Sequence, residues 1–306
     1  DRKFGINGMQ MVYLPDQAVY TACMAFGNGL NNLSTTGGGL NGLYNTAVGW
    51  SASELNTTGY LDVSMGIQAL RNNTTGFYMT AIGANALFSN TTGQENTACG
   101  VGTLQNNTTG NYNVAVGGGT LTANTTGETN TGVGNLTLLR NTTGLQNVGI
   151  GYRCLQFNTT GFFNTAAGYR AMETNTTGAA NAAFGEHALS VCSTANYNTA
   201  VGMYAGNAFT GTGDAYNTFV GYASGTGIAG GLRNTIIGAN ISVPSGVNDS
   251  VHIGNGSGDT RISFDENGVM TLGVIPTEYA DDAAAIVGGL VSGNIYRTGS
   301  ALKIVV

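Results

Sequence analysis

The residues able to carry out acid–base or metal chemistry are few and widely separated in this chain of 306 residues. Its two histidines, His187 and His252, lie in different parts of the sequence. Metal sites and catalytic centres need several side chains at defined spacings, and neither histidine has such a cluster around it. We therefore expect no metal site, no cofactor and no catalytic histidine.

The carboxylates do not form an obvious catalytic pair either. Glycosidases place two Asp or Glu side chains across the scissile bond, whereas Glu95, Glu128 and Asp214 are scattered. Glu173 and Glu186 could approach each other across one unit of the repeat described below, but solvated corners account for both. We predict that the chain is not an enzyme.

Cysteine usage and charge exclude further classes. The four cysteines, Cys23, Cys99, Cys154 and Cys192, show no CxxC spacing, so neither a zinc site nor a redox motif is indicated. The net charge is −6, which lacks the basic footprint that binding to nucleic-acid phosphates requires. No apolar run approaches the ~18 residues of a membrane span. We expect no nucleic-acid partner and no membrane insertion.

The composition nevertheless favours a folded chain. Only 8% of the residues are charged, against ~25% in typical domains. Disorder usually accompanies low hydrophobicity, yet 42% of the residues here are hydrophobic. Fifty glycines without a Gly-X-Y period exclude collagen.

An internal repeat determines the expected fold. The string Asn-Thr-Thr-Gly recurs at a constant interval of 17 residues, beginning at Asn56, Asn73, Asn90, Asn107, Asn124, Asn141, Asn158 and Asn175. A second landmark glycine closes a small apolar triplet at the same interval, at Gly49, Gly66, Gly83, Gly100, Gly117, Gly134, Gly151, Gly168, Gly185 and Gly202. Degenerate units follow up to Gly254, as capping of a repeat array predicts.

The repeat unit favours strands over helices. Two fixed glycines in 17 residues leave no room for a helix of ~10 residues. Triplets such as Thr46–Val48 and Val114–Val116 are short and β-prone, and Asn and Gly accept the left-handed backbone of tight corners. We predict an all-β protein, a β-solenoid or β-roll of 17-residue coils, with Asn and Thr ladders along its axis.

Three parts follow from the extent of the repeat. Residues 1–37 form an N-terminal cap or joint, and residues 38–255 form the solenoid. Residues 256–306 form a small mixed tip, with a hairpin over Arg261–Leu272, a short helix after Pro276 and two strands about Gly299.

Stacking the coils aligns three columns of residues. The residue before each landmark glycine is mostly large and apolar, as in Val48, Met65, Ile82, Val116, Val133, Ile150, Phe184 and Val201; we call this the apolar column and expect it to fill the coil core. The preceding residue is always small, as in Ala47, Ser64, Ala81, Ala98, Ala115, Gly132, Gly149, Ala166, Ala183 and Ala200; this small column should permit close approach of another backbone. Either a partner chain, with three chains packed about one axis, or a close contact within the chain would account for this small column.

The third column and two cysteines complete the expected core. A Leu column falls four residues after each landmark glycine, at Leu70, Leu87, Leu104, Leu121, Leu138, Leu155, Met172 and Leu189, and should fill the second side of the coil. Cys99 and Cys154 occupy apolar and small positions respectively, so both are expected to be buried packing thiols.

Positions that vary between coils are candidates for recognition. Aromatic residues recur directly after Asn-Thr-Thr-Gly, and two Tyr-Arg pairs follow landmark glycines. On a rigid ladder such side chains suit stacking on sugar rings or docking a receptor; alternatively, they cover corner backbone or pack between chains. The candidate receptor-binding residues are Tyr60, Phe77, Tyr78, Tyr112, Phe162, Phe163, Arg153 and Arg170.

These repeats resemble two related groups of proteins. Asn45–Gly49 and Asn198–Gly202, with Ala three residues after the glycine, are similar to repeats of trimeric autotransporter adhesin heads, although the coil here is longer. The form with an Asn-Thr-Thr-Gly turn resembles repeats of phage tail-fibre and virion appendage proteins. The resemblance covers about residues 40–255 and implies a homotrimeric appendage, on a virion or a cell surface, that attaches to a host surface glycan or protein.

Other functions have weaker support. The apolar ends, Met9–Leu14 and Ile304–Val306, would suit strand addition between subunits of an extracellular filament, which is the alternative function. Asn-Thr-Thr is formally an N-glycosylation acceptor, but strict register is better explained by turn geometry. The Thr pairs would suit an ice-binding face, except that they adjoin a glycine at a corner.

Overall fold

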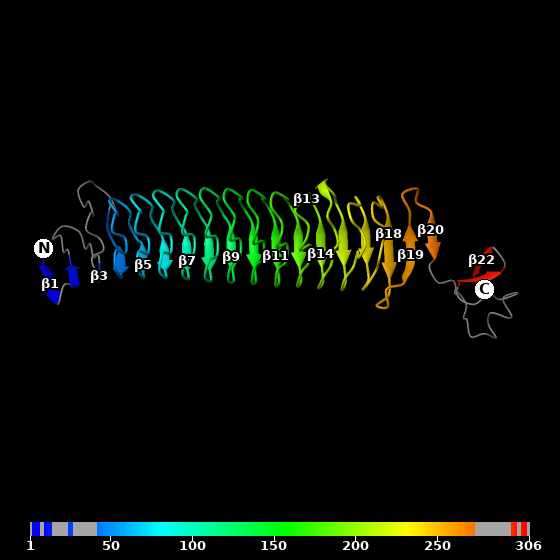
Figure 1. Ribbon diagram of the computed structural model, residues 1–306, viewed down its shortest axis with the longest axis horizontal. Helices are drawn as coiled ribbons and strands as arrows, with labels where there is room; N and C mark the ends of the chain where they lie inside the picture. The colour runs from blue at the N-terminus through cyan, green and yellow to red at the C-terminus, as the bar shows by residue number, and fades with distance from the viewer. Residues whose placement is uncertain are drawn as a thin grey trace.

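The computed structural model is a rod of stacked coils, which confirms the predicted β-solenoid (Figure 1). It describes residues 42–272 continuously, together with residues 2–6, 9–13, 24–26, 295–298 and 301–304. These described residues contain strands and turns but no helix. The helix expected after Pro276 falls outside them.

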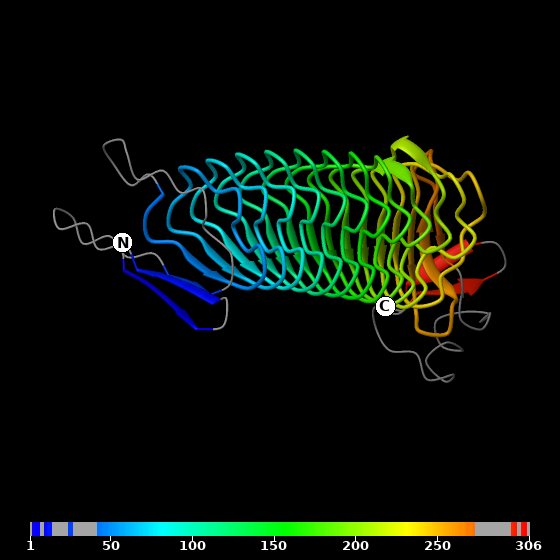
Figure 2. The same cartoon turned by 60° about the vertical axis from the view of Figure 1, so that its left-hand side comes forward.

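One 16-stranded sheet runs along the rod. All of its strands except β19 and β20 are parallel, and each pairs in register with the strand of the neighbouring coil. The parallel strands are β3 (Met24–Phe26), β4 (Thr46–Val48), β5 (Val63–Met65), β6 (Thr80–Ile82), β7 (Thr97–Cys99), β8 (Val114–Val116), β9 (Thr131–Val133), β10 (Val148–Ile150), β11 (Thr165–Ala167), β12 (Ala182–Phe184), β14 (Thr199–Val201), β16 (Thr218–Val220), β17 (Thr235–Ile237) and β18 (Val251–Gly254). Figure 2 shows the successive circuits of the coil.

The remaining strands lie at the ends and at one corner. The predicted hairpin is confirmed: β19 (Thr260–Phe264) and β20 (Met270–Leu272) continue the sheet in antiparallel fashion beyond β18. The two strands about Gly299 are also confirmed, as β21 (Ile295–Thr298) and β22 (Ala301–Ile304). β1 (Arg2–Ile6) pairs with β2 (Met9–Tyr13), and β13 (Thr194–Asn196) pairs with β15 (Thr212–Asp214) at a corner of the solenoid.

Two buried asparagine ladders hold the coils in register. In the first ladder, formed by the Asn of each Asn-Thr-Thr-Gly, Asn107 Nδ2 donates to Asn90 Oδ1 in the preceding coil at 2.8 Å and to Gly110 O at 3.0 Å. In the second ladder, just before each strand, Asn130 Nδ2 donates to Asn113 Oδ1 at 3.1 Å. Buried polar groups satisfied in this way rigidify a core and specify its register.

These ladders also account for the glycosylation-like motif. The Asn side chains of the first ladder are buried from Asn56 to Asn175. The first Thr of each pair also belongs to the corner, because its hydroxyl bonds the next coil, as from Thr74 Oγ1 to Thr91 O at 2.9 Å. The motif is therefore turn chemistry, and the folded coil leaves no amide free for a glycan.

The corners use left-handed backbone at residues that are not glycine. Two to three residues of each coil have a φ near +50° to +60°, including Tyr78, Arg153 and Leu155. Such a conformation costs an L-residue roughly 1–2 kcal/mol. The landmark glycines have a φ near +130°, and a Cβ at Gly66 would lie 2.6 Å from the carbonyl carbon of Gly83. Close stacking therefore demands glycine at that column.

The structure reverses the faces predicted for two columns. The small column points into the coil, where Ala81, Ala98 and Ala115 are fully buried. The apolar column points outward, and the exposed fraction of Ile150 reaches 47%. The prediction that the apolar column fills the core is therefore wrong. The interior is narrow at the strand, because the Leu column, confirmed as buried, already occupies the space opposite it.

Linked changes in side-chain size support the assignment of the small column to the interior. At Phe219 the small column carries a large ring, and the Leu column becomes glycine at Gly206 and Gly225. A Cβ at Gly206 would lie 2.7 Å from Phe219 Cδ2, and one at Gly225 would lie 2.5 Å from Phe219 Cδ1. One phenyl ring thus replaces the packing of two Leu side chains, because the two columns share one interior.

Candidate functional site

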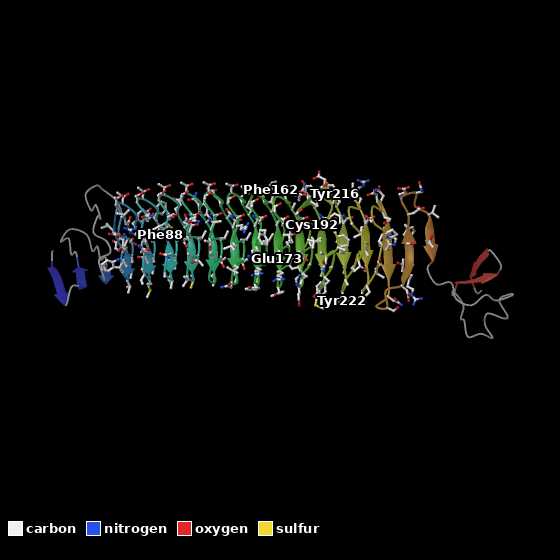
Figure 3. The ribbon with its side chains drawn as sticks, in the orientation of Figure 1. Phe88, Phe162, Glu173, Cys192, Tyr216 and Tyr222 are labelled. Atoms are coloured by element: carbon white, nitrogen blue, oxygen red, sulfur yellow. The ribbon has the colours of Figure 1, made fainter. Side chains whose placement is uncertain are left out.

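The candidate residues lie along two opposite edges of the rod. The turn edge is formed by the two residues after each Asn-Thr-Thr-Gly or its equivalent, and the glycine edge by the two residues after each landmark glycine. Figure 3 places Phe162 and Tyr216 along the turn edge and Tyr222 along the glycine edge. The corners determine where these side chains project, since the second residue of each pair has left-handed backbone in nearly every coil.

An aromatic cluster occupies the turn edge near the N-terminal end of the solenoid. The rings of Tyr60 and Phe77 stack with their centroids 4.8 Å apart. Tyr78 packs edgewise against both, at 5.5 Å and 5.1 Å. Three of the candidate residues therefore lie together on one surface, and the sequence did not predict their mutual stacking.

The other turn-edge candidates are separate from this cluster. Phe162 and Phe163 form an edgewise pair at 5.2 Å, and both are exposed. Tyr112 is 48% exposed, and the equivalent residues of the adjacent coils are Glu95 and Thr129. The aromatic candidates therefore form three separate patches on the turn edge.

The two candidate arginines lie on the glycine edge and share one carboxylate. Glu173 Oε1 lies 3.8 Å from Arg153 Nη1 and 3.6 Å from Arg170 Nε. Each guanidinium also lies 5.3 Å from the ring centroid of the preceding tyrosine, Tyr152 or Tyr169. Arg153 Nε is buried and has no hydrogen-bond partner among the described residues. Ion pairing thus already occupies part of this cationic surface.

A longer aromatic row continues along the glycine edge. Tyr152 and Tyr169 stack at 5.6 Å, and His187 stacks on Tyr204 at 5.3 Å. Tyr169 meets His187, and Tyr204 meets Tyr222, through edgewise contacts. His187 is therefore one member of an aromatic row, as expected for a surface coil residue.

The ring geometry limits what this surface can bind. A sugar ring stacks on the face of an aromatic side chain. Within a stacked pair such as Tyr152 and Tyr169, each ring covers one face of its neighbour. Edgewise rings that are half-exposed, such as Tyr78 and Phe163, keep more of their faces available. These two turn-edge rings are therefore the better candidates for stacking recognition.

Sequence reasoning missed one turn-edge feature. Tyr197 and Tyr216 stack at 4.8 Å with an interplanar angle of 2°, beside the additional β13–β15 pair. Asn196 Nδ2 donates to Asp214 Oδ1 at 2.9 Å across the same pair. The sequence did contain a signal for this irregular coil, which is the 19-residue spacing from Gly202 to Gly221. A coil with two extra residues cannot follow the same backbone path as its 17-residue neighbours.

A cavity of about 440 Å³ lies where the C-terminal hairpin meets the last coil, lined in part by His252, Ser263, Asp265 and Thr271. His252 Nε2 lies 3.1 Å from Ser250 Oγ, and burial lowers the pKa of His252. The Ser250 hydroxyl donates to Asn234 Oδ1 at 2.6 Å, so it terminates the second ladder. This serine is not arranged as a nucleophile activated by the histidine.

The thiols inside the solenoid are protected from reaction. Burial raises the pKa of Cys154 to about 12 and that of Cys192 to about 11, which keeps both as thiols. The prediction that Cys154 is a packing thiol is confirmed. The same prediction for Cys99 is wrong, because Cys99 belongs to the apolar column, which lies on the outward face of the sheet and leaves this side chain only half-buried.

The described residues contain no group of three or more His, Cys, Asp or Glu side chains placed to hold a metal ion. Nor do they include a helix long and apolar enough to cross a bilayer. No family model, no curated protein and no solved structure matches the chain.

Proposed function

We propose that the chain is a structural appendage protein that attaches to a cell surface as a homotrimer, without catalysis. Its setting is a virion fibre or an extracellular surface, and its receptor is a surface glycan or protein. The observation that carries this proposal is an uninterrupted column of paired strands and buried asparagine ladders. Such a column makes a stiff spacer that displays variable polar and aromatic residues along its outer edges.

The distribution of side chains supports a display role. The interior is filled by repeated Leu, Ala and Asn residues, which leaves little scope for variation inside the coil. Tyr78 and Phe163, by contrast, are half-exposed and lie at corners with left-handed backbone, which the neighbouring coil holds in place. Rigid aromatic residues contribute contact area at a low cost in conformational entropy.

The first experiment measures shape and mass. The purified chain is imaged by negative-stain electron microscopy, and its mass is measured by multi-angle light scattering over a range of concentrations. The proposal expects rods of one length with three times the mass of the chain. Rods that lengthen with concentration would instead indicate the filament, in which the apolar ends Met9–Leu14 and Ile304–Val306 pair between subunits by strand addition.

The second experiment measures attachment. Binding of the wild type to whole cells and to a glycan array is compared with that of a Tyr78→Ala, Phe163→Ala double variant. Gln146→Ala is the matched control, because Gln146 occupies the same exposed, left-handed position in another coil. Loss of binding in the double variant alone supports the turn edge as the receptor site. Equal binding by all three proteins removes these residues from the site, and no binding by the wild type overturns the adhesive role.

A further inference from the structure

The outward face of the parallel sheet is apolar and carries no charge from β4 to β18. Each strand directs its first and third residues outward and its middle residue inward. Across these thirteen strands the first residues are Thr, Val or Ala, and the third residues form the apolar column, which continues through Val220, Ile237 and Ile253. We call this surface the outer sheet face.

The exposure of this face is unusual for a soluble surface. Met65, Phe184 and Val201 are 43%, 43% and 41% exposed, and several Val and Ile residues are exposed to a similar extent. Single exposed apolar residues are common, but a contiguous patch beyond a few hundred Å² marks an interaction site on most soluble proteins. Large residues on the glycine edge, such as Trp50 and Val101, both 65% exposed, extend the strip on one side.

We propose that the outer sheet face is the surface through which copies of this chain associate, side by side, parallel and in register. This inference rests on the proposed homotrimer and names the surface that joins its chains. It replaces the expectation that copies approach through the small column, which lies inside the coil.

The size of the face fits a second copy of the chain. Thirteen strands at ~4.8 Å make a strip about 60 Å long, and four residues from the first strand position to the glycine edge make it about 13 Å wide. The resulting area is roughly 800 Å² per copy, which a three-fold assembly shares between two neighbours; it is comparable to the area that one partner contributes to a stable protein interface. Its lack of charge suits the core of an obligate contact, since charged residues are depleted there.

Symmetry sets the register. Three identical rods that use one face must be related by a three-fold axis, because closed homo-oligomers have point-group symmetry. A three-fold axis along the rods makes them parallel and places equivalent coils at the same height. The Cys99 side chains of all copies then lie together at the centre of the assembly. An antiparallel pair would instead separate them.

Cys99 therefore provides a probe of this register. All variants carry Cys23→Ser, and Cys154 and Cys192 are buried, so Cys99 is the reactive thiol in the described part of the chain. A short bis-maleimide should join two copies through thioether bonds and give a covalent dimer on a denaturing gel. Cys99→Ser should remove the product, and Cys99→Ser with Val201→Cys should restore it in a distant coil.

A further variant keeps Cys99 and adds Val201→Cys, and together the variants separate the possible arrangements. Cross-linking by each single cysteine supports the parallel register. Cross-linking only when Cys99 and Val201→Cys are present together indicates an antiparallel pair and overturns it. If the mass is trimeric but no variant cross-links, the outer sheet face is not the interface, while the homotrimer stands. A monomeric mass refutes the homotrimer itself.

A substitution that introduces a charge tests the outer sheet face without a cross-linking reagent. Ile150→Lys places a cation on the outer sheet face at a side chain 47% exposed, so it should dissociate the assembly while the coil keeps its circular dichroism spectrum. Gln146→Lys adds the same charge on the turn edge and should keep the trimeric mass. A trimer that persists in Ile150→Lys would refute the assignment of this face.

Discussion

The buried carboxyl of Asp62 accepts a hydrogen bond from the backbone N–H of Met79, one coil ahead, at 3.0 Å. Asp62 stands in the second ladder, where most coils have Asn, and its own backbone N–H donates to Asn45 Oδ1 at 2.9 Å. Burial raises the pKa of Asp62 to about 8. A protonated acid can donate like an amide, whereas an ionised one would be an uncompensated charge in the core.

Stability should therefore fall as the pH rises. The folded pKa of Asp62 lies above the unfolded value, so its stabilising contribution is full below pH ~4 and is lost as the pH rises through about 8. The expected loss is on the order of 3–5 kcal/mol. Asp62→Asn should remove this dependence and raise the unfolding temperature at pH ~8, measured by circular dichroism.

The control for this prediction is an exposed carboxylate. A hydrogen bond from Arg233 lowers the pKa of Asp249, so Asp249→Asn should leave the alkaline loss of stability in place. An unfolding temperature of the Asp62→Asn variant that tracks the wild type at every pH would show that Asp62 is not the titrating group.

The contacts of Phe219 with Gly206 and Gly225 predict that substitutions at these three positions compensate one another in stability. Phe219→Ala should destabilise the coil by about 3–5 kcal/mol, because the buried ring leaves a cavity. Adding Gly206→Leu and Gly225→Leu should restore most of this loss, since both glycines already have the left-handed backbone of the Leu column. Each Leu substitution alone should be destabilising through overlap with the Phe219 ring. A triple variant no more stable than Phe219→Ala in urea would contradict the shared interior.

The first ladder ends at an unpaired acceptor. Asn175 Oδ1 is buried and has no hydrogen-bond partner among the described residues, and the equivalent residue of the next coil is Cys192. Cys192→Asn should supply the missing donor and stabilise the rod by about 1 kcal/mol. Cys154→Asn is the matched control and should be destabilising, because Cys154 lies outside both ladders. Equal effects of the two variants on the unfolding temperature would argue against ladder extension.

Thr129 is a β-branched residue on left-handed backbone, with a φ of 58°. Thr129→Asn should stabilise the chain by roughly 0.5–1 kcal/mol, since Asn adopts this conformation more readily. Thr126→Asn, at an exposed position of the same coil without a positive φ, should give no comparable gain. Chemical denaturation of the two variants provides the comparison, and an equal gain in both would rule out relief of backbone strain.

The repeat period alone was sufficient to predict the coil length, the strand positions and the buried Leu column. It was not sufficient to predict which face of the strand is internal. Both faces carry uncharged residues, and period-two alternation cannot distinguish a narrow interior lined by Ala from an apolar outer surface. The coupled change at Phe219, Gly206 and Gly225 was the signal in the sequence that two columns share the interior.

The candidate recognition surface was predictable only as a set of variable positions. Tyr60, Phe77 and Tyr78 could be assigned to neighbouring corners because each coil repeats the same path. Their stacking, and the pairing of Glu173 with two arginines, depend on side-chain rotamers that spacing does not determine. The Tyr197–Tyr216 stack depends on an irregular coil, which a period-based prediction treats only as a defect.

Most of the 17-residue coils bring their own strand and their own members of both ladders, as Asn124 and Asn130 illustrate. Duplicating or deleting one such unit therefore preserves the pattern of bonds between neighbours. The length of the rod can therefore change by whole coils, through recombination between the similar gene segments that encode them, while both ends of the molecule stay the same.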